Sequence, residues 1–337
     1  MGTMFSDGNR WSRLGNRSMS TKTIRMEMTM LTRSPTKNIS NATSSRRSWL
    51  PALALPFLSV IPLHVHALGA DLGDWVAPTP GHNLFAWYGI KTENSGLYQK
   101  GKVVDNRAQL DANVSLVRFT NPVHVGESWI GNPQFALQIA ELSPKHMNGQ
   151  EDASGIGDPF VSFPIFFPLD RSKREYFVFA PFLYLPLGEY DHNDPLNIGE
   201  NRWKGVFQFG YQRGLSDHFN VELLAEATVY GENDEYGPAK QTLKQKPLYE
   251  GRAALSYQFN NPGNSLIGGG LQKNIGGENE LDGVDQRDRI DSTAFYVQAS
   301  TFITPSDQIL FGFSRDIDTE NGFKMDKQFK LRYLHVF

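Results

Sequence analysis

The 337-residue sequence contains no cysteine, so disulfides, thiolate nucleophiles and cysteine metal ligands are excluded. It also lacks an excess of charge of either sign. With 33 Lys and Arg against 36 Asp and Glu, no overall field indicates nucleic acid or an acidic substrate. No Asp-x-Asp-x-Asp-Gly calcium loop and no phosphate-binding glycine loop before a helix is present. We therefore expect no metal, no cofactor and no nucleic-acid partner.

Long apolar runs are missing after residue 70, where no stretch of 18 apolar residues is available to form a transmembrane helix. Aromatic residues and glycine are abundant instead, with 23 Phe, 12 Tyr, 6 Trp and 31 Gly. Aromatic enrichment without long apolar runs is typical of β structure.

An export signal is expected at residues 46–70. Arg46 and Arg47 precede an apolar stretch over residues 50–63, and the small-residue sequences VHA and LGA follow it. This order predicts a secretory signal peptide that is cleaved after Ala67 or Ala70. A spanning helix is the alternative, which three prolines in a short stretch disfavour. Residues 1–45 are rich in Ser, Thr, Arg and Met and are interpreted as a disordered extension or a start assigned too early.

The mature region, residues 71–337, alternates apolar and polar residues with a period of two. In residues 219–230, for example, Phe219 and Leu223 share one face while Glu222 and Glu226 share the other. The same alternation predicts twelve strands, at residues 82–92, 104–119, 129–142, 155–169, 174–188, 204–214, 219–230, 248–259, 265–274, 293–304, 308–316 and 326–337.

Short and long connections alternate along this region. The sequences DRSK (170–173), LSDH (215–218), NNPGN (260–264) and PSD (305–307) are turns, and long polar loops lie between them at 189–203, 231–246 and 276–291. Tight turns at one end and long loops at the other are typical of outer-membrane barrels. We therefore predict an all-β fold, a closed antiparallel up-and-down transmembrane β-barrel of about twelve strands.

Two other β architectures share some of these features. The turns recur every 45 residues, which suits a propeller blade, but each period holds two long strands and no shared motif. A soluble β-sandwich also alternates one buried and one polar face. The export signal, the aromatic content and the apolar C-terminus favour the barrel.

The chain ends in the alternating sequence KQFKLRYLHVF, so its apolar stripe runs to the last residue. A frayed terminus is normally polar, and we expect this strand to close the barrel against the first strand, with the stripe facing lipid. By similarity to other outer-membrane proteins, the stripe is also expected to be the signal read by the outer-membrane assembly machinery. Its residues are Phe329, Leu331, Tyr333 and Phe337.

The chain resembles the family described as putative MetA-pathway of phenol degradation. The resemblance rests on SGIGDPFVSFPIFF (154–167), on YFVFAPFLYLPLGEYD (176–191) and on the aromatic end, and it covers residues 80–337. It implies a transporter-like barrel in the outer membrane of a Gram-negative bacterium, linked to uptake of hydrophobic or aromatic compounds, and no catalytic residues. A structural or surface role, or a barrel enzyme such as a phospholipase, is the alternative function. His146, Asp152 and Ser154 invite that comparison, but the phospholipase pattern Asn-x-x-His-x-Ser-Asn-Gly is absent.

Charged residues on the polar faces are the candidates for selecting a solute in the lumen. They are Glu222, Glu226, Glu250, Arg252, Arg315, Lys330 and Arg332. The alternative is that opposite charges on neighbouring strands pair and fill a narrow barrel.

The sequence GIGDPF is a second candidate feature, because Gly155, Gly157, Asp158 and Pro159 interrupt a regular strand. It is interpreted as a structural kink, with a constriction or lateral opening for the solute as the functional alternative.

Acidic loops at 231–235, 278–291 and 316–320 are candidates for contact with divalent cations at lipopolysaccharide, with solvated loops as the alternative. The expected partners are outer-membrane lipid and lipopolysaccharide, the assembly machinery and a small-molecule solute.

Overall fold

The computed structural model describes residues 69–147 and 149–337. The predicted extension at 1–45 and the signal peptide up to residue 68 lie outside the described residues. In the described part of the chain, no helix is long and apolar enough to cross a membrane.

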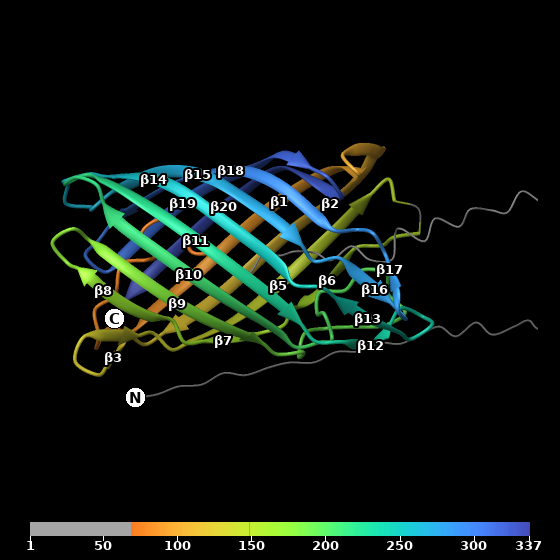
Figure 1. The fold of residues 1–337 in the computed structure, drawn as a ribbon, viewed down its shortest axis with the longest axis horizontal. Coiled ribbons are helices and arrows are strands. Elements are labelled where there is room, and N and C mark those ends of the chain that lie inside the picture. The colour runs from red at the N-terminus through yellow and green to blue at the C-terminus, as the bar shows by residue number, and fades with distance from the viewer. Residues whose placement is uncertain (1–68, 148) are drawn as a thin grey trace, which may run out of the picture. The chain divides into compact units, whose positions relative to one another are not determined.

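Antiparallel wall segments close into a barrel, as predicted (Figure 1). All twelve predicted segments are present. Eleven are the strands β1 (Leu84–Gln99), β2 (Lys102–Thr120), β5 (Gln134–Lys145), β9 (Glu175–Tyr184), β10 (Lys204–Gly214), β11 (Phe219–Tyr230), β14 (Leu248–Gln258), β15 (Leu266–Gly276), β18 (Ile290–Phe302), β19 (Asp307–Thr319) and β20 (Gly322–Val336), and the fourth is divided into β6 (Ala153–Ile156), β7 (Phe160–Ser162) and β8 (Ile165–Asp170).

The last strand pairs with the first, which confirms the expected closure. The register joins Leu84 to Val336 and Lys91 to Phe329. The amide of Phe337 also donates to the carbonyl of Asn83 at 2.9 Å, so the final residue continues the ladder. No edge is left between β1 and β20, because every position along this seam is paired or bulged.

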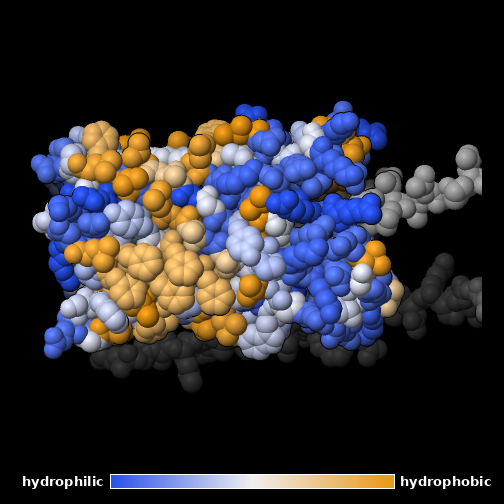
Figure 2. All heavy atoms as spheres, in the orientation of Figure 1, coloured by the Kyte–Doolittle hydropathy of each residue, from blue (hydrophilic) through white to orange (hydrophobic). Residues whose placement is uncertain are grey.

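The two faces of the wall separate as the alternation predicts. On β19, Leu310 is fully buried while Phe311 is 63% exposed, and on β20 Phe329 is 51% exposed. Figure 2 shows the outward apolar side chains gathered over the part of the wall near the short turns, while the loop end is hydrophilic. Aromatic pairs such as Phe85–Phe119 and Phe219–Tyr257, each with ring centroids 5.1 Å apart, lie near the short-turn end. This arrangement is the lipid-facing band and aromatic girdle of an outer-membrane barrel.

The first two strands are longer than predicted. They continue as a hairpin that turns at Lys100 and Gly101, whose φ angles are 50° and 70°. Two consecutive positive φ angles are typical of a two-residue hairpin turn. The extension of β1 begins with Glu93, which pairs with Lys327, so the apolar alternation ends before the strand does.

Two of the loops expected to be irregular contain strands. β12 (Asn233–Tyr236) and β13 (Gln241–Gln245) pair with β16 (Asn279–Leu281) and β17 (Val284–Asp285) in a separate four-stranded sheet. Leu243 and Leu281 face each other in this sheet and are both buried. The strands are short and rich in Lys, Glu and Asn, so their sequence gives no apolar period. A further hairpin of β3 (Val123–Val125) and β4 (Trp129–Gly131) extends the wall beside β8.

The kink predicted at GIGDPF is confirmed as a break between β6 and β7. Asp158 lies in the break and is 4% exposed. Its carboxylate accepts hydrogen bonds from the amides of Gly188 and Glu200, both at 2.9 Å. The break therefore serves as an anchor for the loop 185–203, which folds back over this part of the barrel.

Candidate functional site: the occupied lumen

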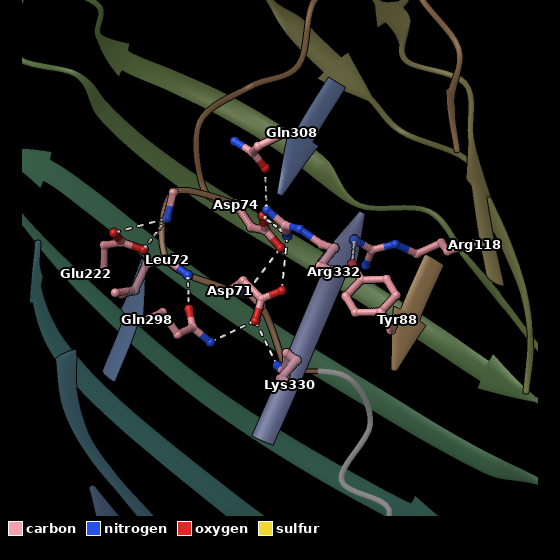
Figure 3. Close-up of polar contacts among 12 residues, drawn as sticks. Asp71, Leu72, Asp74, Tyr88, Arg118, Glu222, Gln298, Gln308, Lys330 and Arg332 are labelled. Atoms are coloured by element: carbon pink, nitrogen blue, oxygen red, sulfur yellow. Dashed lines mark hydrogen bonds and ion pairs between the residues drawn. The ribbon is translucent and has the colours of Figure 1, made fainter. Parts of the chain in front are cut away.

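Residues 69–79 precede the first strand and lie inside the barrel, and we call them the luminal segment (Figure 3). They form a compact turn in which the amide of Asp74 donates to the carbonyl of Asp71 at 3.0 Å. Trp75 follows the turn and is 5% exposed. It packs over Gly210 of β10, where an added Cβ would come within 2.4 Å of the indole ring. A glycine at this inward position makes room for the segment.

Asp71 is the principal anchor of the luminal segment. Its carboxylate contacts Lys330 Nζ at 2.7 Å and Arg332 Nη1 at 3.0 Å, and it accepts a hydrogen bond from Gln298 at 2.8 Å. Burial raises the pKa of Asp71, but the charges of Lys330 and Arg332 outweigh this and lower it to about 2. The carboxylate is therefore ionised at neutral pH, as a buried acid paired with two cations should be.

Asp74 adds a second ion pair to the same strand. It contacts Arg332 Nη1 at 2.8 Å, and the other end of that guanidinium donates to Gln308 at 2.8 Å (Figure 3). Arg332 is only 3% exposed. Two acids of the luminal segment thus balance two bases of β20, which keeps the buried charges compensated.

The backbone of the luminal segment is held from the other side of the lumen. The amide of Gly73 donates to both carboxylate oxygens of Glu222, at 3.1 and 3.2 Å, and the amide of Leu72 donates to Gln298 at 2.8 Å. Apart from these side-chain contacts, the segment makes no β-ladder with the wall in the described residues. Its polar attachment depends on a few groups of β11, β14, β18 and β20, and Leu72 adds apolar packing against β14, β15 and β18.

A second charged group lies beside the first. Glu226 and Glu250 are directly opposite on β11 and β14, and Arg252 contacts Glu250 at 2.5 Å. Gln208 donates to Glu226 at 2.7 Å and Gln272 to Glu250 at 2.8 Å. This half of the lumen is therefore a polar network whose members satisfy one another.

The other half of the lumen is apolar and aromatic. A buried cluster joins Trp75 to Tyr88 of β1, Phe160 of β7, Phe182 of β9 and Val206 of β10. Toward the loop end, Leu196 of the loop 185–203 packs on buried leucines of β2 and β5. One side of the interior thus holds two separate apolar clusters, one at the luminal segment and one near the loops.

A cavity of about 380 Å³ lies beside the luminal segment and reaches the short-turn end of the barrel. Trp75, Phe166 and Phe182 contribute apolar surface to it, while Arg118 and Gln212 contribute polar groups. Arg118 also donates a hydrogen bond to the hydroxyl of Tyr88 (Figure 3). The cavity thus combines apolar walls with a half-buried cation.

The chain is similar to a known protein family and to a solved outer-membrane channel. The family model described as putative MetA-pathway of phenol degradation matches residues 92–329. The chain belongs to this family. It is 31% identical to the COG4313 outer membrane channel from Pseudomonas putida F1, with a TM-score of 0.77 over 80% of this chain and 100% of that chain. The protein is accordingly an outer-membrane β-barrel of a Gram-negative bacterium.

Two other solved barrels are more distant from this member of the phenol-degradation family. The β-domain of the Bordetella autotransporter BrkA has 9% identity and a TM-score of 0.46, over 76% of this chain and 99% of that chain. The translocator domain of NalP from Neisseria meningitidis has 12% identity and a TM-score of 0.46, over 77% and 90%. No curated protein matches the chain.

Six of the seven charged residues proposed for the lumen of this family member face inward, namely Glu222, Glu226, Glu250, Arg252, Lys330 and Arg332. The prediction for Arg315 is wrong. It is exposed and alternates with Phe311 and Phe313 on the outer face of β19. Because β19 continues beyond its last outward phenylalanine toward the loops, a charge on the outer face there can reach water.

The luminal segment was missed, although it brings three of the predicted residues together. Residues 71–75, with the sequence DLGDW, have neither a period of two nor a known motif. Two acids and an aromatic residue directly after the expected cleavage site are the signal that was available. The assembly role of Phe329, Leu331, Tyr333 and Phe337 stays a prediction, although all four lie on the outward face of the chain end.

Proposed function

We propose that the protein is a passive outer-membrane channel for small hydrophobic or aromatic molecules, and that the luminal segment sets the width of its route. The observation that carries this proposal is the apolar content of one side of a closed barrel, where one buried cluster contains Leu196 near the loops and a second contains Trp75 of the luminal segment. An apolar solute that enters from the lipopolysaccharide surface can contact apolar side chains on this side of the lumen.

The mode of attachment suits the luminal segment to a movable role. Strands of the wall share continuous ladders, whereas this segment is held by two acids, by backbone hydrogen bonds to three side chains, and by the packing of Leu72 and Trp75. Loss of a few contacts would free it without opening the wall. The COG4313 channel of Pseudomonas putida F1, by its name, is a channel, and the similarity to it supports the same class of function here.

A barrel enzyme is the alternative, and the residues that suggested it are not assembled. Ser154 pairs with Glu141 in the β5–β6 ladder and is exposed. Among the described residues, no hydrogen bond joins Ser154 to His146 or Asp152. A nucleophile needs its base within hydrogen-bond reach, so this geometry supports a channel rather than a hydrolase.

A cellular uptake assay tests the channel. Expression in a Gram-negative host that lacks its major porins should raise the initial rate of entry of radiolabelled benzyl alcohol several-fold over the empty-vector host. The outer-membrane content of folded barrel, measured by heat modifiability, serves to normalise the rates. Equal rates with and without folded protein would reject the channel, and release of fatty acid from host phospholipid would favour the enzyme.

A further inference from the structure

Arg118 is a half-buried cation that forms no ion pair within the described residues. Its guanidinium donates to the Tyr88 hydroxyl and lies 5.2 Å from the centre of that ring. In the part of the chain that the structure describes, no carboxylate forms an ion pair with it, and its Nε is buried without a hydrogen-bond acceptor. A charge held in this way costs free energy unless a ligand or water compensates it.

Other unmatched polar atoms surround Arg118 in the same cavity. The hydroxyl of Thr120 and the amide oxygen of Gln134 lie directly opposite each other on β2 and β5, and both are buried without partners. The amide oxygens of Asn132 and Gln212 are also buried without hydrogen-bond partners, and these two residues are 7% and 2% exposed. All of them line the 380 Å³ cavity. Rotation of an Asn or Gln amide by half a turn presents its NH2 group instead, so these side chains can donate to an anion.

The charge and the apolar walls of the cavity indicate a ligand that is both anionic and apolar. Its lining includes the arginines Arg118, Arg174 and Arg332 but one acid, Asp74. Arg332 is already compensated by Asp71 and Asp74, which leaves the surplus at Arg118 and Arg174. Arg174 donates to Asn220 and to the carbonyl of Ser216 at the short-turn end, so Arg118 is the arginine nearer the luminal segment. Phe166 and Phe182 give the cavity apolar walls. Its volume falls within the roughly 300–1,000 Å³ of small-molecule sites.

We infer that this cavity is a binding site for small apolar carboxylates, with Arg118 pairing the carboxylate and the Phe166–Phe182 wall contacting the apolar body. A planar guanidinium matches a carboxylate in two-point geometry, which a phenol or an alcohol cannot reproduce. The inference rests on the proposed channel and names the solute class that it would favour.

Equilibrium binding to purified, detergent-folded protein tests the site, with benzoate as the probe and benzyl alcohol as its neutral counterpart. Isothermal titration should give at least tenfold tighter binding of benzoate than of benzyl alcohol. Arg118→Gln keeps a donor for Tyr88 but removes the charge, and the ratio should fall to about one. Acetate should bind at least tenfold more weakly than benzoate, because it lacks the apolar body. A ratio near one in the unmodified protein, or a ratio that survives in Arg118→Gln, overturns the inference.

Arg118→Lys keeps the test decisive if Arg118→Gln fails to fold. An ammonium retains the charge but not the two-point geometry, so benzoate should bind several-fold more weakly while still outcompeting benzyl alcohol. Unchanged benzoate affinity in Arg118→Lys would contradict pairing through the guanidinium. Entry of benzyl alcohol into cells tests the channel separately. If benzyl alcohol enters but the protein does not bind benzoate preferentially, the carboxylate site is rejected and the channel is retained.

Discussion

Asp71→Asn combined with Asp74→Asn is expected to raise the mean conductance of the purified protein in planar bilayers several-fold. The two substitutions leave Lys330 and Arg332 buried without acids, and removing one side of a buried ion pair typically costs about 3–5 kcal/mol. Because the luminal segment has no β-ladder of its own, this cost is relieved when the segment leaves the lumen and admits water and ions around the two bases. The wall ladders are untouched, so the barrel should remain folded.

A matched control places the same chemical change on the short turns. Asp170→Asn with Asp217→Asn alters a half-exposed and an exposed acid of the short turns, neither of which is bonded to the luminal segment in the described residues, and should leave conductance unchanged. Unaltered conductance in the Asp71→Asn/Asp74→Asn protein, with the barrel intact, would show that this segment does not restrict the route.

Leu331→Arg is expected to reduce strongly the fraction of folded, heat-modifiable barrel. Leu331 lies on the outward face of β20, between Phe329 and Tyr333 and paired to Gly89 and Phe311. An arginine on the lipid face costs about 2–4 kcal/mol at the bilayer midplane and about 0–1 kcal/mol near the interface. Urea-dependent refolding into lipid vesicles measures the loss directly.

Two controls separate lipid exposure from simple damage to β20. Leu331→Met keeps an apolar side chain of similar volume and should fold normally. Lys330→Gln changes the adjacent inward residue, and it should leave the folded fraction unchanged while weakening the hold on Asp71. If Leu331→Arg folded as well as Leu331→Met, residue 331 would not face lipid.

The strands of the wall could be predicted because their signals, the alternation of apolar and polar residues and the turn sequences, lie within short segments of the chain. Alternation in residues such as Phe219–Tyr230 requires one apolar and one polar face, and turn sequences such as LSDH mark where each hairpin reverses. The same alternation placed Glu222 and Lys330 in the lumen. Arg315 was misplaced because charge was taken as a sign of the lumen, whereas outward charges are tolerated wherever a strand has left the lipid band.

The interior arrangement could not be predicted because its contacts are remote in sequence. Asp71 and Arg332 are 261 positions apart, and no period or motif links them. The break at Asp158 was visible from its glycines and proline, but its role in holding the loop 185–203 depends on amides of Gly188 and Glu200 that carry no sequence signal. Likewise, the isolation of Arg118 becomes apparent only when every neighbour in the cavity is known.

The central claim is that residues 69–79 occupy and restrict the lumen, and the labelling rate of a single thiol tests it most directly. The chain has no cysteine, so Leu72→Cys introduces one reactive group, at a position that is 3% exposed. With a membrane-impermeant maleimide, the Leu72→Cys protein should react at least tenfold more slowly than a Ser172→Cys protein, whose thiol lies in an exposed turn. Adding Asp71→Asn and Asp74→Asn should remove most of that protection. Labelling of Leu72→Cys as fast as Ser172→Cys in the otherwise unmodified barrel would contradict a luminal position for the segment.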